Sequence, residues 1–152
     1  SKGFSMAGVR MGWIVTKDEA ALHLCHERRD YDTISCGVVD DALSSLALAH
    51  KEAIFARNRG ILNKNRAILD QWVNETPEVK YLRPVAGTTA LVYYNKDIPS
   101  QELCKKLLFE KGVLFTPGEC FEMEGAVRIG YAYDSKTLRE GLDKFTEFLR
   151  EL

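Results

Sequence analysis

Residues 112–133 read GVLFTPGECFEMEGAVRIGYAY, and the predicted fold is built around the two strands and the turn that they suggest. Residues 113–115 are apolar and, with Thr116, predict a short strand, and Pro117-Gly118 predicts a turn directly after it. Residues 127–133 form a second apolar run and predict another strand, with Arg128 inside it. Arg128 could be an edge-strand arginine in a surface ion pair, but its apolar neighbours favour a functional role.

Further elements are predicted on both sides of these strands. Residues 89–94 are β-prone and predict a third strand. A helix opens at Pro99-Ser100, carries leucines at helical spacing and ends at Gly112. Asp134 or Ser135 caps a last helix, whose apolar residues recur at helical spacing to the end of the sequence. The order strand, helix, strand, strand, helix predicts a small α/β sandwich with helices over one face of the sheet.

The first half of the sequence is predicted to be mainly helical. Residues 1–8 form a small-residue loop with no preceding element to anchor it, and residues 11–16 predict a short buried strand. Residues 16–19, TKDE, form a capping box that predicts a helix to about residue 29. Apolar residues at helical spacing from residue 38 to residue 75 predict one long helix, or two helices joined near Gly60.

Composition narrows the functional classes. A hydrophobic fraction of 45%, a charged fraction of 28% and a net charge of −1 are ordinary for a soluble globular protein and favour neither nucleic acid nor a membrane as partner. The four cysteines are widely spaced, which favours a reducing, cytoplasmic setting. His23, Cys25 and His26 have no second ligand cluster to match, so we expect an exposed helix surface and no metal site. Cys36 is expected to be a buried small hydrophobe.

A second group of polar residues stands at the start of the sequence, where Ser1-Lys2 precedes Arg10-Met11-Gly12-Trp13. A lysine amine can form a Schiff base with an aldehyde, and an arginine offers a planar charged fork suited to a phosphate. The glycines between them leave room for the loop to curl around a ligand. A lysine beside a chain end is usually just solvated, so this pattern alone leaves both interpretations open.

Together these motifs resemble the aminotransferase class I and II family, the fold-type-I enzymes that use pyridoxal 5'-phosphate. That family shows Ser-Lys, a glycine-containing loop and then Arg-x-Gly, with the same spacing of eight between lysine and arginine as in this sequence. Residues 112–121 resemble the family's Gly-Val-x-x-x-Pro-Gly-x-x-Phe turn, and residues 127–132 resemble its strand that bears an arginine. The three matches occur in the family's order.

The resemblance implies roles for four residues. Lys2 would hold the cofactor as a Schiff base and move the substrate's α-proton, and Ser1 and Arg10 would help to bind the cofactor. Arg128 would pair with the α-carboxylate of the substrate, since a bidentate arginine–carboxylate pair orients an amino acid.

The resemblance also implies an α/β fold, namely the C-terminal small domain of such an enzyme with the end of its large domain and long connecting helices. Residues 1–35 would be the tail of the cofactor-binding large domain, residues 36–80 the connecting helices, and residues 81–152 the small domain. Family members are longer, and the portion expected before Ser1 would supply the rest of the cofactor pocket.

The implied activity is that of an aminotransferase, with an amino acid and a keto acid as substrates and a homodimer as the full-length enzyme. The resemblance leaves open a lyase or another amino-acid-transforming enzyme of the same fold. It also leaves open a truncated, non-catalytic module that serves only in folding or interaction. Arg128 would contact only the α-carboxylate, so the sequence does not identify which amino acid is the substrate.

Overall fold

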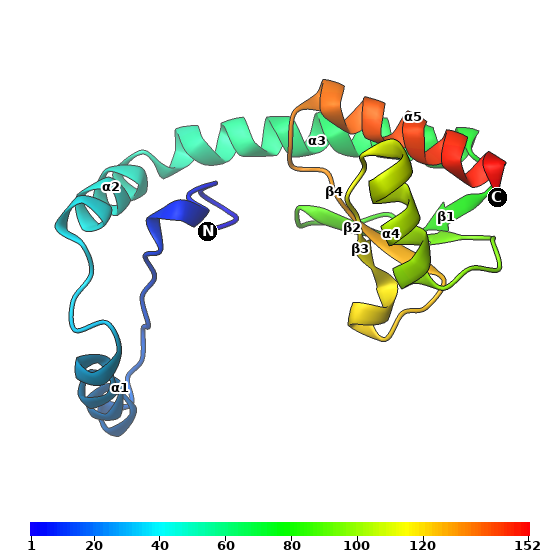
Figure 1. Ribbon diagram of the computed structural model, residues 1–152. Helices are drawn as coiled ribbons and strands as arrows, with labels where there is room; N and C mark the ends of the chain where they lie inside the picture. The colour runs from blue at the N-terminus through cyan, green and yellow to red at the C-terminus, as the bar shows by residue number, and fades with distance from the viewer. The chain divides into compact units, whose positions relative to one another are not determined.

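Five α-helices and four β-strands make up the chain in the computed structural model, which describes residues 1–152 (Figure 1). The residues divide into two units, Ser1–Asn58 and Arg59–Leu152, and the division falls within helix α3 (Lys51–Glu75). The division of the protein at residues 35 and 80 stays a prediction. None of the helices combines the length and the apolar character that crossing a membrane requires.

The second unit contains a four-stranded antiparallel sheet in the order β1-β2-β4-β3. The strands are β1 (Val79–Tyr81), β2 (Thr89–Tyr94), β3 (Thr116–Pro117) and β4 (Ala126–Gly130). The prediction of β2 is confirmed residue for residue, whereas β1 was not predicted. With its helices, this sheet confirms the predicted α/β class.

Two predicted strands are shorter than expected. The strand predicted at residues 113–116 is reduced to β3, which also includes half of the predicted turn. Val113 instead donates a backbone hydrogen bond to Leu107 O and so closes the preceding helix. The strand predicted to end at residue 133 ends at Gly130, because the chain turns away from the sheet towards the last helix.

Alternation along β4 separates the two faces of the sheet. Val127 pairs with Val92 of β2, Ile129 pairs with Ala90, and all four side chains are buried. Successive side chains of a strand point to opposite faces. Arg128 therefore lies on the face turned away from the core.

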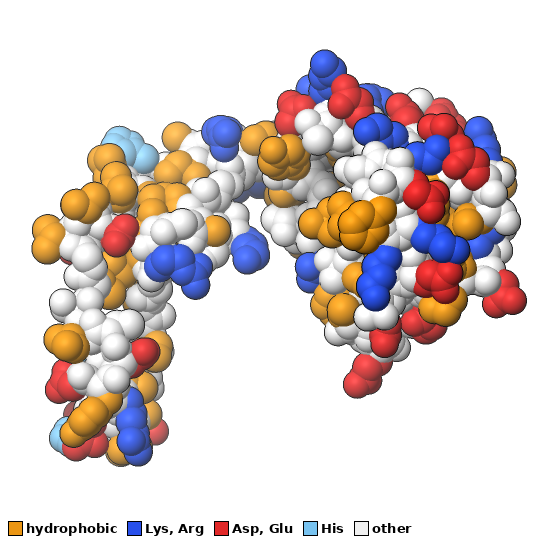
Figure 2. Space-filling view, in the orientation of Figure 1, with side chains coloured by type: hydrophobic (Ala, Val, Ile, Leu, Met, Phe, Trp, Pro, Cys, Tyr) orange, Lys and Arg blue, Asp and Glu red, His pale blue; other side chains and the backbone are white.

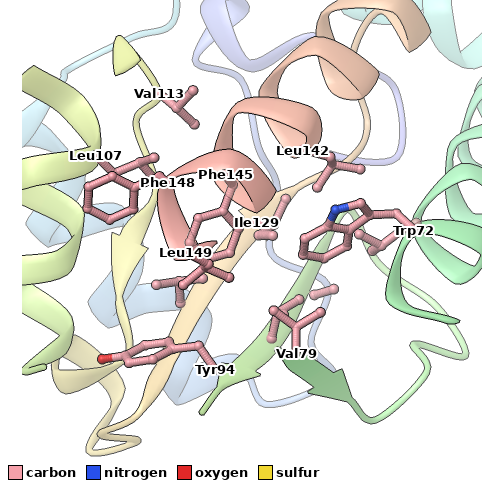
Figure 3. Close-up of a cluster of buried hydrophobic side chains, with 14 of the residues drawn as sticks. Trp72, Val79, Tyr94, Leu107, Val113, Ile129, Leu142, Phe145, Phe148 and Leu149 are labelled. Carbon is pink, nitrogen blue, oxygen red and sulfur yellow. The ribbon is translucent and has the colours of Figure 1, made fainter. Parts of the chain in front are cut away.

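The core of the second unit lies between the sheet and three helices (Figure 3). These are the second half of α3, α4 (Ser100–Lys111) and α5 (Ser135–Glu151). Phe145 of α5 is completely buried, and its ring lies 6.0 Å from that of Trp72 and 5.2 Å, edge to face, from that of Phe115. These contacts join α5 to α3 and to the residue just before β3, which are distant from α5 in the sequence.

The C-terminal end of α4 and the start of α5 are as predicted. Gly112 ends α4 in a left-handed conformation with φ 70°, which glycine adopts without a steric penalty. The side chain of Asp134 caps α5 by accepting hydrogen bonds from the N–H groups of Lys136 and Thr137.

The first unit is built from helices, as predicted, but it lacks the strand predicted at residues 11–16. Its elements are the 3₁₀ turn η1 (Ala7–Val9), α1 (Glu19–Asp32), α2 (Val38–Ala49) and the start of α3. Residues 11–16 pair with none of the four strands, and Trp13, Ile14 and Val15 are 63%, 72% and 88% exposed. An apolar run becomes a strand only beside another strand that accepts its backbone hydrogen bonds.

Two predicted helix boundaries in this unit are wrong. The side chain of Asp18, not of Thr16, caps α1 by accepting from Ala21 N–H at 3.0 Å. The break between α2 and α3 lies at His50, where the N–H group bonds back to Leu46 O, and Gly60 lies inside α3. A single glycine inside a helix costs only about 1 kcal/mol, which the rest of the helix offsets.

The two units differ in their exposed surfaces. The only buried hydrophobic residue of the first unit is Ala47, and Figure 2 shows hydrophobic side chains over much of its visible surface. The visible surface of the second unit carries many more charged side chains (Figure 2). The second unit therefore contains nearly all of the hydrophobic core.

Asn65 of α3 is a polar side chain inside that core, with none of its surface exposed. Its Nδ2 donates to the carbonyl oxygens of Tyr131 and Tyr133 at 2.7 and 2.6 Å, and its Oδ1 accepts from Ser135 Oγ at 2.7 Å. Asn65 thereby joins α3 to the segment that connects β4 with α5.

We expect Asn65→Leu to lower the free energy of unfolding of the protein by about 2–4 kcal/mol, because a buried and a part-buried carbonyl group lose their donor. Urea denaturation followed by circular dichroism measures this change. The control is Asn63→Leu, an exposed position on the same helix, where a change within about 0.5 kcal/mol is expected. Equal effects of the two substitutions would contradict the role of Asn65.

Candidate functional site

The loop that carries Ser1 and Lys2 is a compact turn. The N–H of Ser5 donates to Lys2 O at 3.2 Å, and the N–H of Met6 donates to Ser1 O at 3.1 Å. Both Ser1 and Lys2 are exposed. The turn fixes the backbone of Lys2 and leaves its amine accessible.

This loop is anchored by α3, which follows it in the sequence. The ring of Phe4 packs on that of Phe55 with centroids 4.8 Å apart, and Asn58 Nδ2 donates to Gly3 O at 2.8 Å. Arg57 Nη1 in turn donates to Asn58 Oδ1 at 3.0 Å. The anchor comes from the start of α3, more than fifty residues later in the sequence, so no local pattern predicted it.

Arg10 ends the 3₁₀ turn η1 in a left-handed conformation, with φ 53°, and Ser5 adopts φ 55° on the other side of the turn. Residues other than glycine rarely adopt this conformation, and such residues cluster at functional sites. Arg10 Nη1 donates to Ala7 O at 3.0 Å, and the exposed guanidinium makes no other hydrogen bond in the chain. Its remaining N–H groups are available to a ligand.

Arg128 lies in the second unit, on the open face of the sheet. Its strand neighbours in register are Leu91 of β2 and Thr116 of β3. Its Nη2 donates to Thr116 Oγ1 at 3.1 Å, and its Cζ lies 4.8 Å from the centroid of the Phe121 ring. The guanidinium is exposed yet held by two side chains.

The 3₁₀ turn η2 (Gly118–Phe121) positions the Phe121 ring. Gly118 is buried, and a Cβ atom there would collide with the carbonyl oxygen of Met123 and lie 2.6 Å from that of Ala126. Only glycine permits this close approach of two backbone segments. The Pro-Gly turn in the sequence therefore has a steric cause that the sequence does not reveal.

Glu124 ties η2 to the start of α4. Its carboxylate accepts from Ser100 N–H at 2.5 Å, from Ser100 Oγ at 3.1 Å and from Gly125 N–H at 3.1 Å. Ser100 Oγ also accepts from Glu119 N–H at 3.1 Å. Hydrogen bonds from the backbone N–H groups of Ser100 and Gly125 hold the pKa of Glu124 below its usual value of 4.5. No sequence motif singled out this residue.

We expect this carboxylate to make the stability of the protein depend on pH. Because the folded state lowers the pKa of Glu124, its contribution is present above 4.5 and is lost as pH falls through the folded-state pKa. Urea denaturation at a series of pH values should show that Glu124→Gln removes part of the acid destabilisation.

Glu122→Gln is the matched control, because the side chain of Glu122 forms none of these hydrogen bonds. This variant should keep the pH dependence of the unsubstituted protein. An unchanged pH profile in Glu124→Gln would rule out the proposed stabilisation by the carboxylate.

The remaining sequence candidates lie elsewhere. Cys36 is exposed in the loop between α1 and α2, so the expectation of a buried hydrophobe is wrong. Cys36 is exposed because the first unit buries few side chains of any kind. His23 Nδ1 lies 3.7 Å from Glu27 Oε1 across one turn of α1, and both side chains are exposed.

The chain matches the model of the family "Aminotransferase class I and II" over residues 1–145. In structure it is similar to a PLP-dependent aminotransferase from Streptococcus suis, with 44% identity and a TM-score of 0.94 over 98% of this chain and 40% of that one. In sequence it is 27% identical to a capreomycidine synthase from Streptomyces vinaceus, over 98% of this chain and 38% of the relative. It is 24% identical to an aspartate aminotransferase from Sulfolobus acidocaldarius, over 100% of this chain and 40% of the relative.

The fold and the family match define the class: the chain belongs to the aminotransferase class I and II family. It spans about two fifths of the length of these relatives. The predicted family resemblance is thus confirmed, whereas the roles of Ser1, Lys2, Arg10 and Arg128 stay predictions.

Proposed function

We propose that this chain carries the cofactor lysine and the substrate-binding arginine of a pyridoxal-phosphate-dependent aminotransferase. The observation that carries the proposal is the arrangement of Arg128, whose guanidinium is held by Thr116 and Phe121 on the open face of the sheet. A fixed, exposed guanidinium suits a carboxylate, because its planar fork can donate two parallel hydrogen bonds.

The residues of the first loop fit the cofactor. Lys2 offers an exposed amine on a hydrogen-bonded turn, Ser1 precedes it, and Arg10 offers uncommitted N–H groups for a phosphate. Bound pyridoxal phosphate supplies an electron sink for the negative charge that develops at the α-carbon of an amino acid. We therefore assign attachment of the cofactor to Lys2 and binding of its phosphate to Arg10, with Ser1 beside them.

The proposed reaction uses two side chains of this chain directly. The Nζ atom of Lys2, once released by the incoming amino acid, accepts the proton from the substrate's α-carbon and returns it later in the reaction. Arg128 binds the α-carboxylate and so holds the substrate in one orientation. The substrates of the complete enzyme would be an amino acid and a keto acid.

The rest of the pocket must come from polypeptide beyond these residues. The first unit buries a single hydrophobic residue, Ala47, and the chain spans about two fifths of its relatives. We propose that the complete enzyme covers this unit, and that it is a homodimer in the cytoplasm. The 152 residues by themselves would bind the cofactor weakly and be inactive.

Attachment of the cofactor can be tested on the complete protein that carries this chain. After incubation with pyridoxal phosphate and reduction with borohydride, peptide mass spectrometry should locate the cofactor on Lys2. Lys2→Ala should abolish this labelling and the visible absorbance band of the bound cofactor. Lys17→Ala, at another exposed lysine of the same unit, should change neither. Stable labelling at a lysine other than Lys2 would refute the assignment.

A second candidate reaction is favoured by the similarity to a capreomycidine synthase, which is named a synthase and not an aminotransferase. Arg128 and Lys2 would serve such a reaction equally well, since both act at the α-carbon end of an amino acid. A lyase would use the same two residues. The same fold and the same two residues are therefore compatible with more than one reaction.

Product analysis separates these reactions. The complete protein should convert an amino acid and a keto acid into a new pair of keto acid and amino acid, with conversion abolished by Lys2→Ala. Release of ammonia without a new amino acid would show a lyase. Consumption of the amino acid into a product that keeps its nitrogen, without any keto acid, would show a synthase.

A further inference from the structure

Arg128 is held in place by groups that belong to two different structural elements. Thr116 lies directly beside it in the register of β3 and β4, and its Oγ1 accepts a hydrogen bond from Nη2 at 3.1 Å. Phe121 belongs to the 3₁₀ turn η2, and its ring lies 4.8 Å from the guanidinium carbon. One contact fixes an edge of the guanidinium and the other supports a face.

Both supports are themselves rigidly attached to the second unit. Thr116 is tied by the sheet, while the turn that carries Phe121 is held by the close approach at Gly118 and by the Glu124–Ser100 hydrogen bonds. Phe121 and Thr116 therefore lie at fixed positions relative to β4. The long, flexible side chain of Arg128 gains an orientation that the strand alone does not give it.

This arrangement has a consequence for binding. An arginine side chain that is free in solution loses conformational entropy when a ligand fixes it, and this loss weakens binding. Contacts that fix the guanidinium beforehand reduce the loss. The hydrogen bond to Thr116 occupies one edge of the guanidinium and leaves its other N–H groups for a carboxylate.

We propose that Thr116 and Phe121 are positioning residues that hold Arg128 ready for the α-carboxylate of the substrate. The inference rests on the proposed function, because it takes Arg128 as the carboxylate-binding residue. It assigns to Thr116 the orientation of the fork and to Phe121 the support of its face. Neither residue contacts the reacting atoms in this scheme.

The test uses the complete protein, loaded with cofactor, and pairs each disruptive substitution with a conservative one. Thr116→Val removes the hydroxyl and keeps the shape, whereas Thr116→Ser keeps the hydroxyl. Phe121→Leu removes the ring, whereas Phe121→Tyr keeps it. Thr116→Val and Phe121→Leu should each raise KM for the amino acid about threefold to tenfold, with kcat changed by less than about twofold. Thr116→Ser and Phe121→Tyr should leave KM within about twofold of the value for the unsubstituted protein.

A second readout separates positioning from general damage. The amine that corresponds to the amino acid but lacks its carboxylate should react in all variants at the rate seen with the unsubstituted protein. The ratio of kcat/KM for the amino acid to kcat/KM for the amine should therefore fall about threefold to tenfold in Thr116→Val and Phe121→Leu. An equal loss for both compounds would overturn the inference, because it would show a purely structural role.

A third readout needs no catalysis. Phenylglyoxal modifies arginine, and peptide mass spectrometry can follow its reaction with Arg128 in the presence of propionate. The propionate concentration that gives half protection should rise about threefold to tenfold in Thr116→Val and Phe121→Leu. An unchanged concentration in both variants would overturn the inference.

Arg128→Lys distinguishes failure of this inference from failure of the proposed function. If Arg128→Lys leaves KM for the amino acid unchanged, Arg128 does not bind the carboxylate and both proposals fall. If Arg128→Lys raises KM while Thr116→Val and Phe121→Leu do not, only the positioning role falls. In the Arg128→Lys background, the two substitutions should change KM by less than about twofold, because the group they position is absent.

Discussion

The antiparallel pairing of β4 with β2 is the constraint on which the second unit and its candidate site depend. It turns Val127 and Ile129 into the core and Arg128 to the opposite face. A shift of one residue in register would bury the guanidinium and expose both apolar side chains, which is strongly unfavourable. Hydrophobic burial on one face of the sheet therefore keeps a charged group on the other. The strand pairing that buries Val127 and Ile129 therefore also fixes the position of Arg128 on the opposite face.

The two units differ in how far each supports its candidate functional residues. The second unit has a core around Phe145, and the elements that hold Arg128 are attached to it. The first unit carries Lys2 and Arg10 but buries only Ala47 among its hydrophobic residues. Burial of apolar surface is the main favourable contribution to folding. The surroundings of Arg128 are thus stabilised by a core within the chain, whereas the loop of Lys2 is anchored only through Phe55 and Asn58 in a unit with little burial. We propose that the complete enzyme supplies further protein surface around this unit.

The parts of the fold that could be predicted are those with local causes. The end of α4 follows from the freedom of Gly112, and the start of α5 follows from the side chain of Asp134. The predictions are wrong for segments whose structure depends on a partner that is distant in the sequence. Residues 11–16 have the composition of a strand but no strand to pair with, and β1 forms only because β2 lies beside it. The break between α2 and α3 lies at His50 and not at Gly60. The low helix propensity of one glycine is therefore offset by the other residues of α3.

For the candidate site, the sequence predicts which chemical groups take part but not which residues hold them in place. Lys2, Arg10 and Arg128 belong to motifs whose residue types have evident chemical uses. Thr116 and Phe121 stand in the same stretch as Arg128, yet nothing in their spacing shows that a hydroxyl and a ring meet one guanidinium.

The structure shows why residues 116–128 bring these side chains together. Gly118 allows two backbone segments to approach, and this approach places η2 and its phenylalanine beside the strand. Residues 112–128 therefore act together as one support for one charged side chain. The turn and the strand that follow one another in the sequence therefore belong to one arrangement around Arg128.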